Sequence, residues 1–535
     1  MSNSRKAGVL RTGMLLVGMS AAGLLAGACS LLLSKEALTC ATNADCAKYP
    51  GTTCDLAALE CRAGSSLDGS TGADVDVPDA DSGPPDVVVP FDGSDPCLNP
   101  NKPLEELKGD INTNLTLSCE KDYLIVGRVA VVPPFTATIA AGTTLYGDTR
   151  VDVTTNSLGT LVVPPGSRIV ATGTADKPVV FTSAKKLGAM YAVDGGTTVG
   201  SGDWGGIFVF GEAPVNTPDG TSTKPSLAPW GSFGGNKPSN DSGRLEYVRI
   251  EYAGAKLPDG QDGTSLDLGG VGDQTVIDHV QVRFSANDCF EVLGGKVNLK
   301  HILCQYPSDD GIAWENGWTG KVQFVVVQGR PGVDDTANGL QGRSGAPPAT
   351  PVSEPIIFNG TFCGQNLVPG TTLQYGIRAE TFTRFHLFNS VFMGWQSAID
   401  LRGTNIASDV AGDAGVPSIE FKSSVAFGNI TANVAFDETQ TTGGTSNPNF
   451  DDDGMFDEAA WWKLAANNNS EGNPGIPKCF DAVAPRFGTP GPINAATSAQ
   501  PPNDGFFDPT AKYVGAFKDQ GDLWATGRWV VWNDK

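Results

Sequence analysis

Short apolar segments that resemble one another recur along most of this 535-residue chain, and they limit the possible folds more than any other feature. LEYVRIEY at 245–252 matches IDHVQVRF at 277–284, and the second half of that unit returns 22 residues later as ILCQY at 302–306. GKVNLKHI at 295–302 is matched by GKVQFVVV at 320–327, and IAAGTTLYG at 139–147 is matched by VPPGSRIVA at 163–171. Apolar residues alternate within these units, as they do in strands with one buried face.

Strands that recur every 22–25 residues favour a parallel β-helix, in which each coil buries its inner face against the next coil. A β-propeller repeats at about 40 residues or more, which fits poorly. A β-sandwich remains the other alternative, although it predicts no similarity between successive units. We therefore expect an all-β chain whose residues 96–535 form one right-handed parallel β-helix.

The N-terminus carries the features of an export signal. Arg5, Lys6 and Arg11 precede an apolar run over residues 14–28, and Gly27-Ala28-Cys29 follows Leu24-Leu25. Basic residues, a short apolar stretch and small residues before a cleavage site are typical of secretory signals, and 15 apolar residues are fewer than the roughly 20 that span a bilayer. The Cys29 motif resembles the bacterial lipoprotein signal, although Ala26 stands where that pattern usually has Leu. The basic and apolar residues predict a signal peptide at 1–28. The resemblance predicts a lipid on Cys29 and, with Ser30 next, an outer-membrane location at the cell surface or the periplasmic face. An ordinary signal peptide that is cleaved nearby is the alternative.

Export also bears on the ten other cysteines, because disulfides form outside the cytoplasm. Four of them lie in a segment at 29–66 that is too short to bury a useful core, so crosslinks would stabilise it. Zinc binding there is disfavoured because the spacing lacks C-x-x-C and the chain has three histidines. Cys97 and Cys119 form a plausible local pair, and the other pairings stay open. The cysteines apart from Cys29 are Cys40, Cys46, Cys54, Cys61, Cys97, Cys119, Cys289, Cys304, Cys363 and Cys479.

Residues 67–95 contain eight Asp, four Pro, four Gly and no basic residue. This composition predicts an extended, disordered acidic linker between the cysteine-rich segment and the β-helix. The formal net charge of the whole chain is −22, which argues against nucleic-acid binding.

Four segments together resemble a group of surface or secreted Gram-negative proteins with right-handed parallel β-helix folds, many of them lipoproteins. The GDWGGI sequence is the most specific of these features, and the resemblance implies a fold and a location but no activity. At the centre of GDWGGI, Trp204 is expected to pack inside the coil, with sugar stacking as the alternative. The segments are GTADKPVVFTS (173–183), GDWGGIFVFGEAPVN (202–216), LEYVRIEYAG (245–254) and GGVGDQTVIDHVQV (269–282), with a similar C-terminal FFDPTAKYVGAFKDQGDLWATGRW (506–529).

Acidic residues concentrate at equivalent repeat positions. Asp288 aligns with Asp310, and Asn287 with Asp309, so stacked coils would bring these side chains about 4.8 Å apart. Three interpretations follow. The one we favour is structural: Asp and Asn tolerate tight turns and form local hydrogen bonds there. The others are Ca²⁺ binding, or an acid/base set for glycan cleavage assisted by Glu291 or Glu315.

Comparison with parallel β-helix polysaccharide hydrolases supports catalysis only in part. Asp309-Asp310 matches their Asp-Asp element, but no histidine is flanked by glycines and no Arg-x-Lys follows. A lyase would need a catalytic base. Lys300 and Arg283 are candidates, but no motif supports either of them. A second acidic loop with Asp451, Asp453 and Gly454 lacks the full spacing of a calcium loop, so it is a weak metal candidate.

These observations favour a lipid-anchored envelope protein that binds a polysaccharide or a surface protein over an enzyme. A polysaccharide lyase or glycoside hydrolase acting through Asp288, Asp309 and Asp310 is the alternative, and a purely structural component is the third. The sequence implies no cofactor other than possible Ca²⁺.

Overall fold

The computed structural model separates the chain into two compact units, residues 1–88 and 89–535. It describes residues 52–55, 60–63, 95–193, 195–330, 337–347, 349–365, 374–380, 382–403, 405–412, 416–430, 432–435, 453, 456–494 and 496–532. In the first unit, β1 (Thr52–Asp55) and β2 (Glu60–Ala63) form an antiparallel pair that places Cys54 opposite Cys61. Cys29, Cys40, Cys46 and most of the 67–95 linker lie outside the described residues. No helix in the described part is long and apolar enough to cross a membrane.

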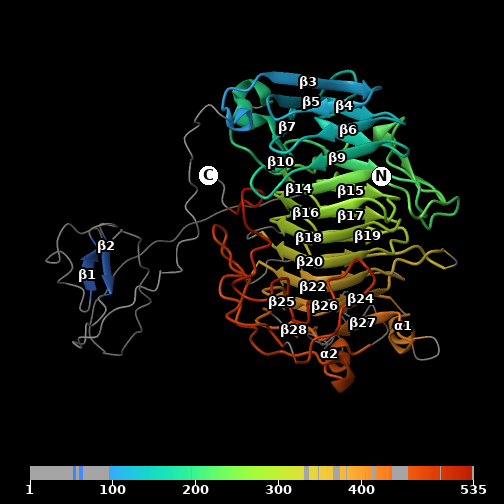
Figure 1. The fold of residues 1–535 in the computed structure, drawn as a ribbon. Coiled ribbons are helices and arrows are strands. Elements are labelled where there is room, and N and C mark those ends of the chain that lie inside the picture. Colours follow the sequence, from blue (N-terminus) through green and yellow to red (C-terminus); the bar gives the residue numbers. More distant parts are fainter. Residues whose placement is uncertain are drawn as a thin grey trace, which may run out of the picture. The chain divides into compact units, whose positions relative to one another are not determined.

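The second unit is a parallel β-helix, as the sequence predicted (Figure 1). Its described part contains one continuous sheet of 24 strands, wound into three faces whose strands pair with the coils before and after. Seven long strands turn a corner and contribute to two faces each: β3 (Leu104–Ile111), β5 (Asp122–Val131), β14 (Gly243–Glu251), β16 (Val276–Arg283), β18 (Asn298–Gln305), β20 (Lys321–Gln328) and β22 (Ile356–Cys363).

The remaining strands define the faces. Face 1 holds the first halves of β14, β16, β18, β20 and β22 with β4 (Leu115–Leu117), β6 (Thr136–Ile139), β9 (Arg168–Thr172), β24 (Phe385–Phe388) and β27 (Ile419–Lys422). Face 2 holds their second halves and the first halves of β3 and β5, with β7 (Thr144–Gly147), β10 (Val179–Ser183), β25 (Val391–Met393) and β28 (Val425–Ala426). Face 3 holds the second halves of β3 and β5 with β8 (Thr160–Val163), β11 (Gly206–Phe210), β15 (Leu266–Gly269), β17 (Phe290–Leu293), β19 (Ile312–Glu315), β21 (Leu340–Gly342), β23 (Tyr375–Ala379) and β26 (Ser397–Leu401).

Among the residues that the structure describes, helices are few and short. They are α1 (Ile406–Ala411), α2 (Glu458–Trp462) and 3₁₀ turns η1 (Pro96–Leu98), η2 (Ala184–Leu187), η3 (Ala189–Tyr191), η4 (Pro225–Leu227) and η6 (Ala465–Asn467). An insertion between β11 and β14 carries η4 and the small antiparallel pair β12 (Ser222–Thr223) and β13 (Ser232–Phe233).

The corner between faces 1 and 2 uses left-handed backbone, which non-glycine residues rarely adopt. One residue per coil takes a φ of 51–61° there, and this bend lets one strand continue onto the next face. The row consists of Tyr247, His279, His301, Phe324, Asn359, Asn389 and Ser423.

Most of the predicted repeats are confirmed as neighbouring coils. Val248 pairs with Val280, and Val280 with Ile302. Two matches are wrong in detail. The GKV match aligns Val322 with Val297, whereas the structure pairs Val322 with Leu299, because the turns before the two strands differ in length. The match of 139–147 with 163–171 aligns strands from different faces, since β7 belongs to face 2 and β9 to face 1.

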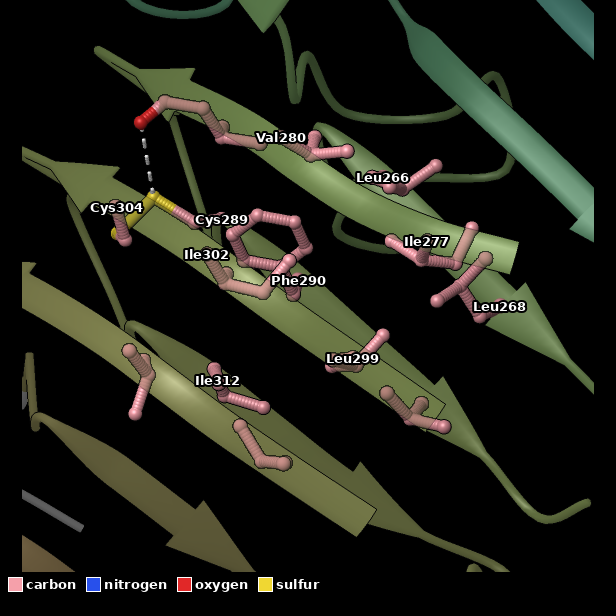
Figure 2. Packing of buried hydrophobic residues seen from close by; sticks show 14 of the residues in the cluster. Leu266, Leu268, Ile277, Val280, Cys289, Phe290, Leu299, Ile302, Cys304 and Ile312 are labelled. Atoms are coloured by element: carbon pink, nitrogen blue, oxygen red, sulfur yellow. Dashed lines mark hydrogen bonds between the residues drawn. A yellow bond between two sulfur atoms is a disulfide. The ribbon is translucent and has the colours of Figure 1, made fainter. Parts of the chain in front are cut away.

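The interior is a stack of aliphatic and aromatic side chains from all three faces. Figure 2 shows Leu266, Phe290 and Ile312 on successive strands of face 3, with Ile277 and Leu299 contributed by face 1. Their near-complete burial supplies the main stabilisation of each coil against the next.

Three disulfides lie in the described part. Cys97–Cys119, the pair suggested from sequence, lies near the first coil, and Cys289–Cys304 joins two successive coils within the core (Figure 2). Cys363–Cys479 holds the start of the C-terminal segment against face 2.

The C-terminal segment, residues 476–532, runs back along the coils and covers face 2 from β14 to β28 (Figure 1). Polar side chains at the outer side of face 2 and its corner bond to its backbone. Gln281 Nε2 donates to the Val531 carbonyl at 2.9 Å, and Asn359 Nδ2 donates to the Tyr513 carbonyl at 2.7 Å. Face 2 is therefore occupied by the chain itself.

Candidate functional site

The carboxylates predicted to meet do meet, at the corner where the chain passes from face 2 to face 3. Asp288 and Asp310 precede β17 and β19 on neighbouring coils, and carboxylate oxygens of Asp288, Asp309 and Asp310 lie within 4.8 Å of one another. Asp288 and Asp310 are 5% and 1% exposed. The repeat alignment of Asp288 with Asp310 therefore located a real cluster.

The hydrogen bonds of this cluster belong mainly to the backbone of the next coil. Asp288 Oδ1 accepts the Asp310 N–H at 2.9 Å, and Asp310 Oδ1 accepts the Asn338 N–H at 2.8 Å. Asn338 Oδ1 in turn accepts the Tyr375 N–H at 2.9 Å. These side chains form a ladder that satisfies backbone donors at the start of face 3, which is the turn role favoured from sequence.

Two buried carboxyl groups on neighbouring coils strongly disfavour simultaneous ionisation. Burial raises the pKa of Asp288, and the nearby Asp310 and Asp309 raise it further. Burial and Asp309 likewise raise the pKa of Asp310, although hydrogen bonds from Asn338 oppose this. A shared proton or a bound cation would relieve the repulsion. One oxygen each of Asp288 and Asp310 already binds backbone N–H, so the cluster supplies few of the six to eight oxygens that Ca²⁺ takes.

The other sequence candidates do not join this cluster. Glu291 and Glu315 lie on the outer side of face 3 and pair with basic side chains. Arg283 is buried on face 2 near Glu251, and Lys300 on face 1 donates to the Phe506 carbonyl at 2.7 Å. The proposed bases Arg283 and Lys300 therefore belong to other faces.

Trp204 and Asp453 are buried, and their contacts are structural. Trp204 is fully buried, and its Nε1 donates to the Glu251 carbonyl at 2.8 Å; the lack of a side chain on Gly147 makes room for the indole. Burial rules out the sugar-stacking alternative. Asp453 is also buried and accepts the Phe456 N–H at 3.0 Å, whereas Asp451 and Gly454 lie outside the described residues.

Face 3 carries a group of charged residues that the sequence analysis missed. Lys224, the residue before η4 in the insertion, lies over β15 and β17, with its Nζ 3.1 Å from Asp267 Oδ2 and 3.0 Å from Glu291 Oε2. Burial and the neighbouring Glu291 raise the pKa of Asp267 to about 7, although Lys224 opposes the increase. Lys224 therefore partly compensates two acids at one end of this group.

The charged group continues across four further strands of face 3. Arg343 bridges Glu315 at 3.2 Å and Glu380 at 2.7 Å, and Arg402 pairs with Asp400 at 2.8 Å. The Arg343 side chain is 45% exposed. We call this group the charged band; it comprises Lys224, Asp267, Glu291, Glu315, Arg343, Arg378, Glu380, Asp400 and Arg402.

A signal for the band was present in the sequence. Arg378 and Glu380, like Asp400 and Arg402, are charged residues two positions apart at the ends of apolar strands. Period-two alternation places such residues together on the outer side of a sheet.

A comparison with protein families agrees with the β-helix architecture. A family model described as a pectate-lyase like beta helix domain matches residues 109–465. No curated protein matches the sequence significantly. The crystal structure of pectate lyase Pel9A is similar over 79% of this chain and 85% of that chain, with 10% sequence identity and a TM-score of 0.30.

Proposed function

The chain belongs to the family of pectate-lyase-like β-helix domains, and we propose that it is a lipid-anchored outer-membrane protein whose face 3 binds polysaccharide. The observation that carries the binding proposal is the charged band, which runs over successive strands of face 3 and whose Arg343 and Glu315 side chains are 45% and 37% exposed. Strands of a sheet lie about 4.8 Å apart, so the band offers hydrogen-bonding groups at a regular spacing. A long regular face suits a repeating polymer.

We infer that the polymer is neutral. The arginines of the band are paired with carboxylates, and its four basic and five acidic side chains give a formal charge of −1. Uronate groups would compete with these carboxylates, whereas sugar hydroxyls can both donate and accept. The acidic chain as a whole also disfavours anionic polymers.

Affinity electrophoresis of the purified protein in gels containing neutral or uronic-acid polysaccharides tests the proposal. Arg343→Ala should weaken binding at least 10-fold. Arg244→Ala is the matched control, because Arg244 lies on face 1, is 47% exposed and also pairs with a glutamate. Equal effects of the two substitutions, or binding to uronic polymers alone, would contradict the proposal.

Attachment by lipid rests on the Cys29 motif and needs its own experiment. Cys29→Ser should leave unprocessed precursor and remove the protein from the detergent phase. Membrane fractionation of the unaltered protein should place it in the outer membrane. Normal processing of the variant would overturn the lipid proposal without affecting polysaccharide binding.

A polysaccharide lyase or glycoside hydrolase is the second candidate, favoured by the convergence of Asp288, Asp309 and Asp310. Mass spectrometry of products from a polysaccharide panel, with Ca²⁺ and with chelator, tests it. Defined oligosaccharides that disappear in Asp310→Asn would support catalysis at this cluster, whereas intact polymer throughout would leave binding as the function.

A further inference from the structure

Two of the three histidines in the chain stack on each other at the corner between faces 1 and 2. His279 and His301 occupy equivalent left-handed positions on neighbouring coils, with φ of 54° and 52°. Their ring centroids are 4.1 Å apart. The left-handed corner therefore brings together two imidazoles that are 22 residues apart in the sequence.

Asp278 completes the group from the end of the face 1 segment of β16. Its Oδ1 lies 2.9 Å from His279 Nδ1 and 2.7 Å from His301 Nδ1. One potential ligand atom from each residue lies within 4.8 Å of the other two. The Asp278, His279 and His301 side chains are 29%, 15% and 17% exposed, so solvent reaches the group.

The donor set suits a metal ion. Two imidazole nitrogens converge on one carboxylate oxygen, and a bound cation would take the place of the protons between Asp278 Oδ1 and Nδ1 of His279 and His301. Lys300, next to His301 in the sequence, directs its Nζ to the Phe506 carbonyl.

Aromatic residues of the C-terminal segment enclose one side of the histidine pair. The Trp524 ring centroid lies 5.2 Å from that of His301, and the Trp529 centroid lies 5.3 Å from that of His279. Such an apolar surround limits solvent access and strengthens ligand interactions.

We propose that Asp278, His279 and His301 bind a divalent transition metal such as Zn²⁺, with water at the fourth position. Imidazole and carboxylate ligands suit Zn²⁺, which takes ligands at about 2.0–2.2 Å in tetrahedral sites. Binding through Nδ1 requires each neutral ring to carry its proton on Nε2, and modest side-chain rotations would separate the three ligand atoms around the ion. The site would crosslink two coils beneath the C-terminal segment.

Isothermal titration of the metal-free protein with Zn²⁺, and absorption spectroscopy with Co²⁺, test this site. One ion should bind per chain, with Co²⁺ spectra of a nitrogen and oxygen site. His279→Asn and His301→Asn should each weaken binding at least 100-fold. Asparagine suits these positions because Asn359 and Asn389 occupy the same corner with φ of 57° and 53°.

His386→Gln is the control, since the third histidine lies on face 1 between Glu354 and Glu420. It should leave binding unchanged, and circular dichroism should show that the variants are folded. Absence of stoichiometric binding would overturn the site. Binding that survives both asparagine substitutions, or thiolate charge-transfer bands with Co²⁺, would place the metal elsewhere and also overturn it.

Discussion

The Asp288 carboxylate accepts the backbone N–H of Asp310 at 2.9 Å, and so links two coils through a side chain that is itself buried. Burial raises the pKa of both carboxyls, so the folded chain keeps protons that the unfolded chain loses above about pH 4. The free energy of unfolding therefore falls as the pH rises. Asp310→Asn, which keeps an acceptor and removes the charge, should increase that free energy by about 1–2 kcal/mol at pH 8.

Denaturant unfolding at pH 4 and pH 8 measures this effect, and the variant should match the unaltered protein at pH 4. Glu420→Gln provides a control of opposite sign. Hydrogen bonding to His386 lowers the pKa of Glu420 to about 2, so its contribution is lost as the pH falls. If Ca²⁺ stabilises the unaltered protein but not Asp310→Asn, the Asp288–Asp310 cluster is instead a cation site.

His386 should titrate far above the ordinary histidine range. Burial favours the neutral ring, but hydrogen bonds with Glu354 and Glu420 outweigh it and raise the pKa of His386 to about 9. Because the folded pKa is raised, this stabilisation is present in full below about pH 6.5 and is lost as the pH rises through 9. His386→Gln should lower the free energy of unfolding by about 2 kcal/mol at pH 6, with the difference closing above pH 9.

Nuclear magnetic resonance of the imidazole carbons provides a direct check of the His386 pKa. Glu354→Gln should lower the midpoint of the His386 titration, because it removes the partner 3.0 Å from Nε2. A midpoint near 6.5 in the unaltered protein would show that the two carboxylates do not stabilise the charged ring.

The sequence predicted the coils where strand alternation and turn length agree. Val280 and Ile302 were matched correctly because the intervening turn residues occupy similar positions in both units. Val322 was misaligned by two residues because apolar alternation has period two, and a shift of two preserves the pattern. Side-chain periodicity alone therefore cannot fix register when a turn changes length.

Other features depend on what covers a face, which local sequence does not reveal. Asn359 and Gln281 have the polar character of solvent-facing residues, yet Asn359 is fully buried and both bind the C-terminal segment. Glu251 is similar, since its buried carboxylate is held by Lys186 and Arg249. Such groups become identifiable only when distant segments are brought together by the fold.

Glu458, at the start of α2, should make the last coils sensitive to alkaline pH. Burial and repulsion from Asp453 raise the pKa of Glu458 to about 8, and its carboxylate accepts the Leu401 N–H at 3.3 Å. The folded protein therefore loses stability as the pH rises from about 4 through 8. Glu458→Gln should be more stable than the unaltered protein at pH 9 and equal to it at pH 4.

Thermal unfolding at those two pH values measures the Glu458 effect. Asp453→Asn should reduce it, because removing the neighbouring charge lowers the pKa of Glu458. A Glu458→Gln variant that is less stable at both pH values would show that the glutamate contributes a specific hydrogen bond rather than a buried charge.

The C-terminal segment should detach locally when its contacts with face 2 are weakened. Asn359 Nδ2 donates to the carbonyls of Ala511 at 3.3 Å and Tyr513 at 2.7 Å, so Asn359→Ala leaves both carbonyls without this donor. Losing buried hydrogen bonds costs about 1–3 kcal/mol. Amide hydrogen exchange in residues 505–516 should accelerate about 10-fold or more, while the strands of face 3 keep their protection.

Asn101→Ala, at an exposed position, is the control and should change neither region. Uniform acceleration over all coils would show instead that the segment and the β-helix open as one cooperative unit.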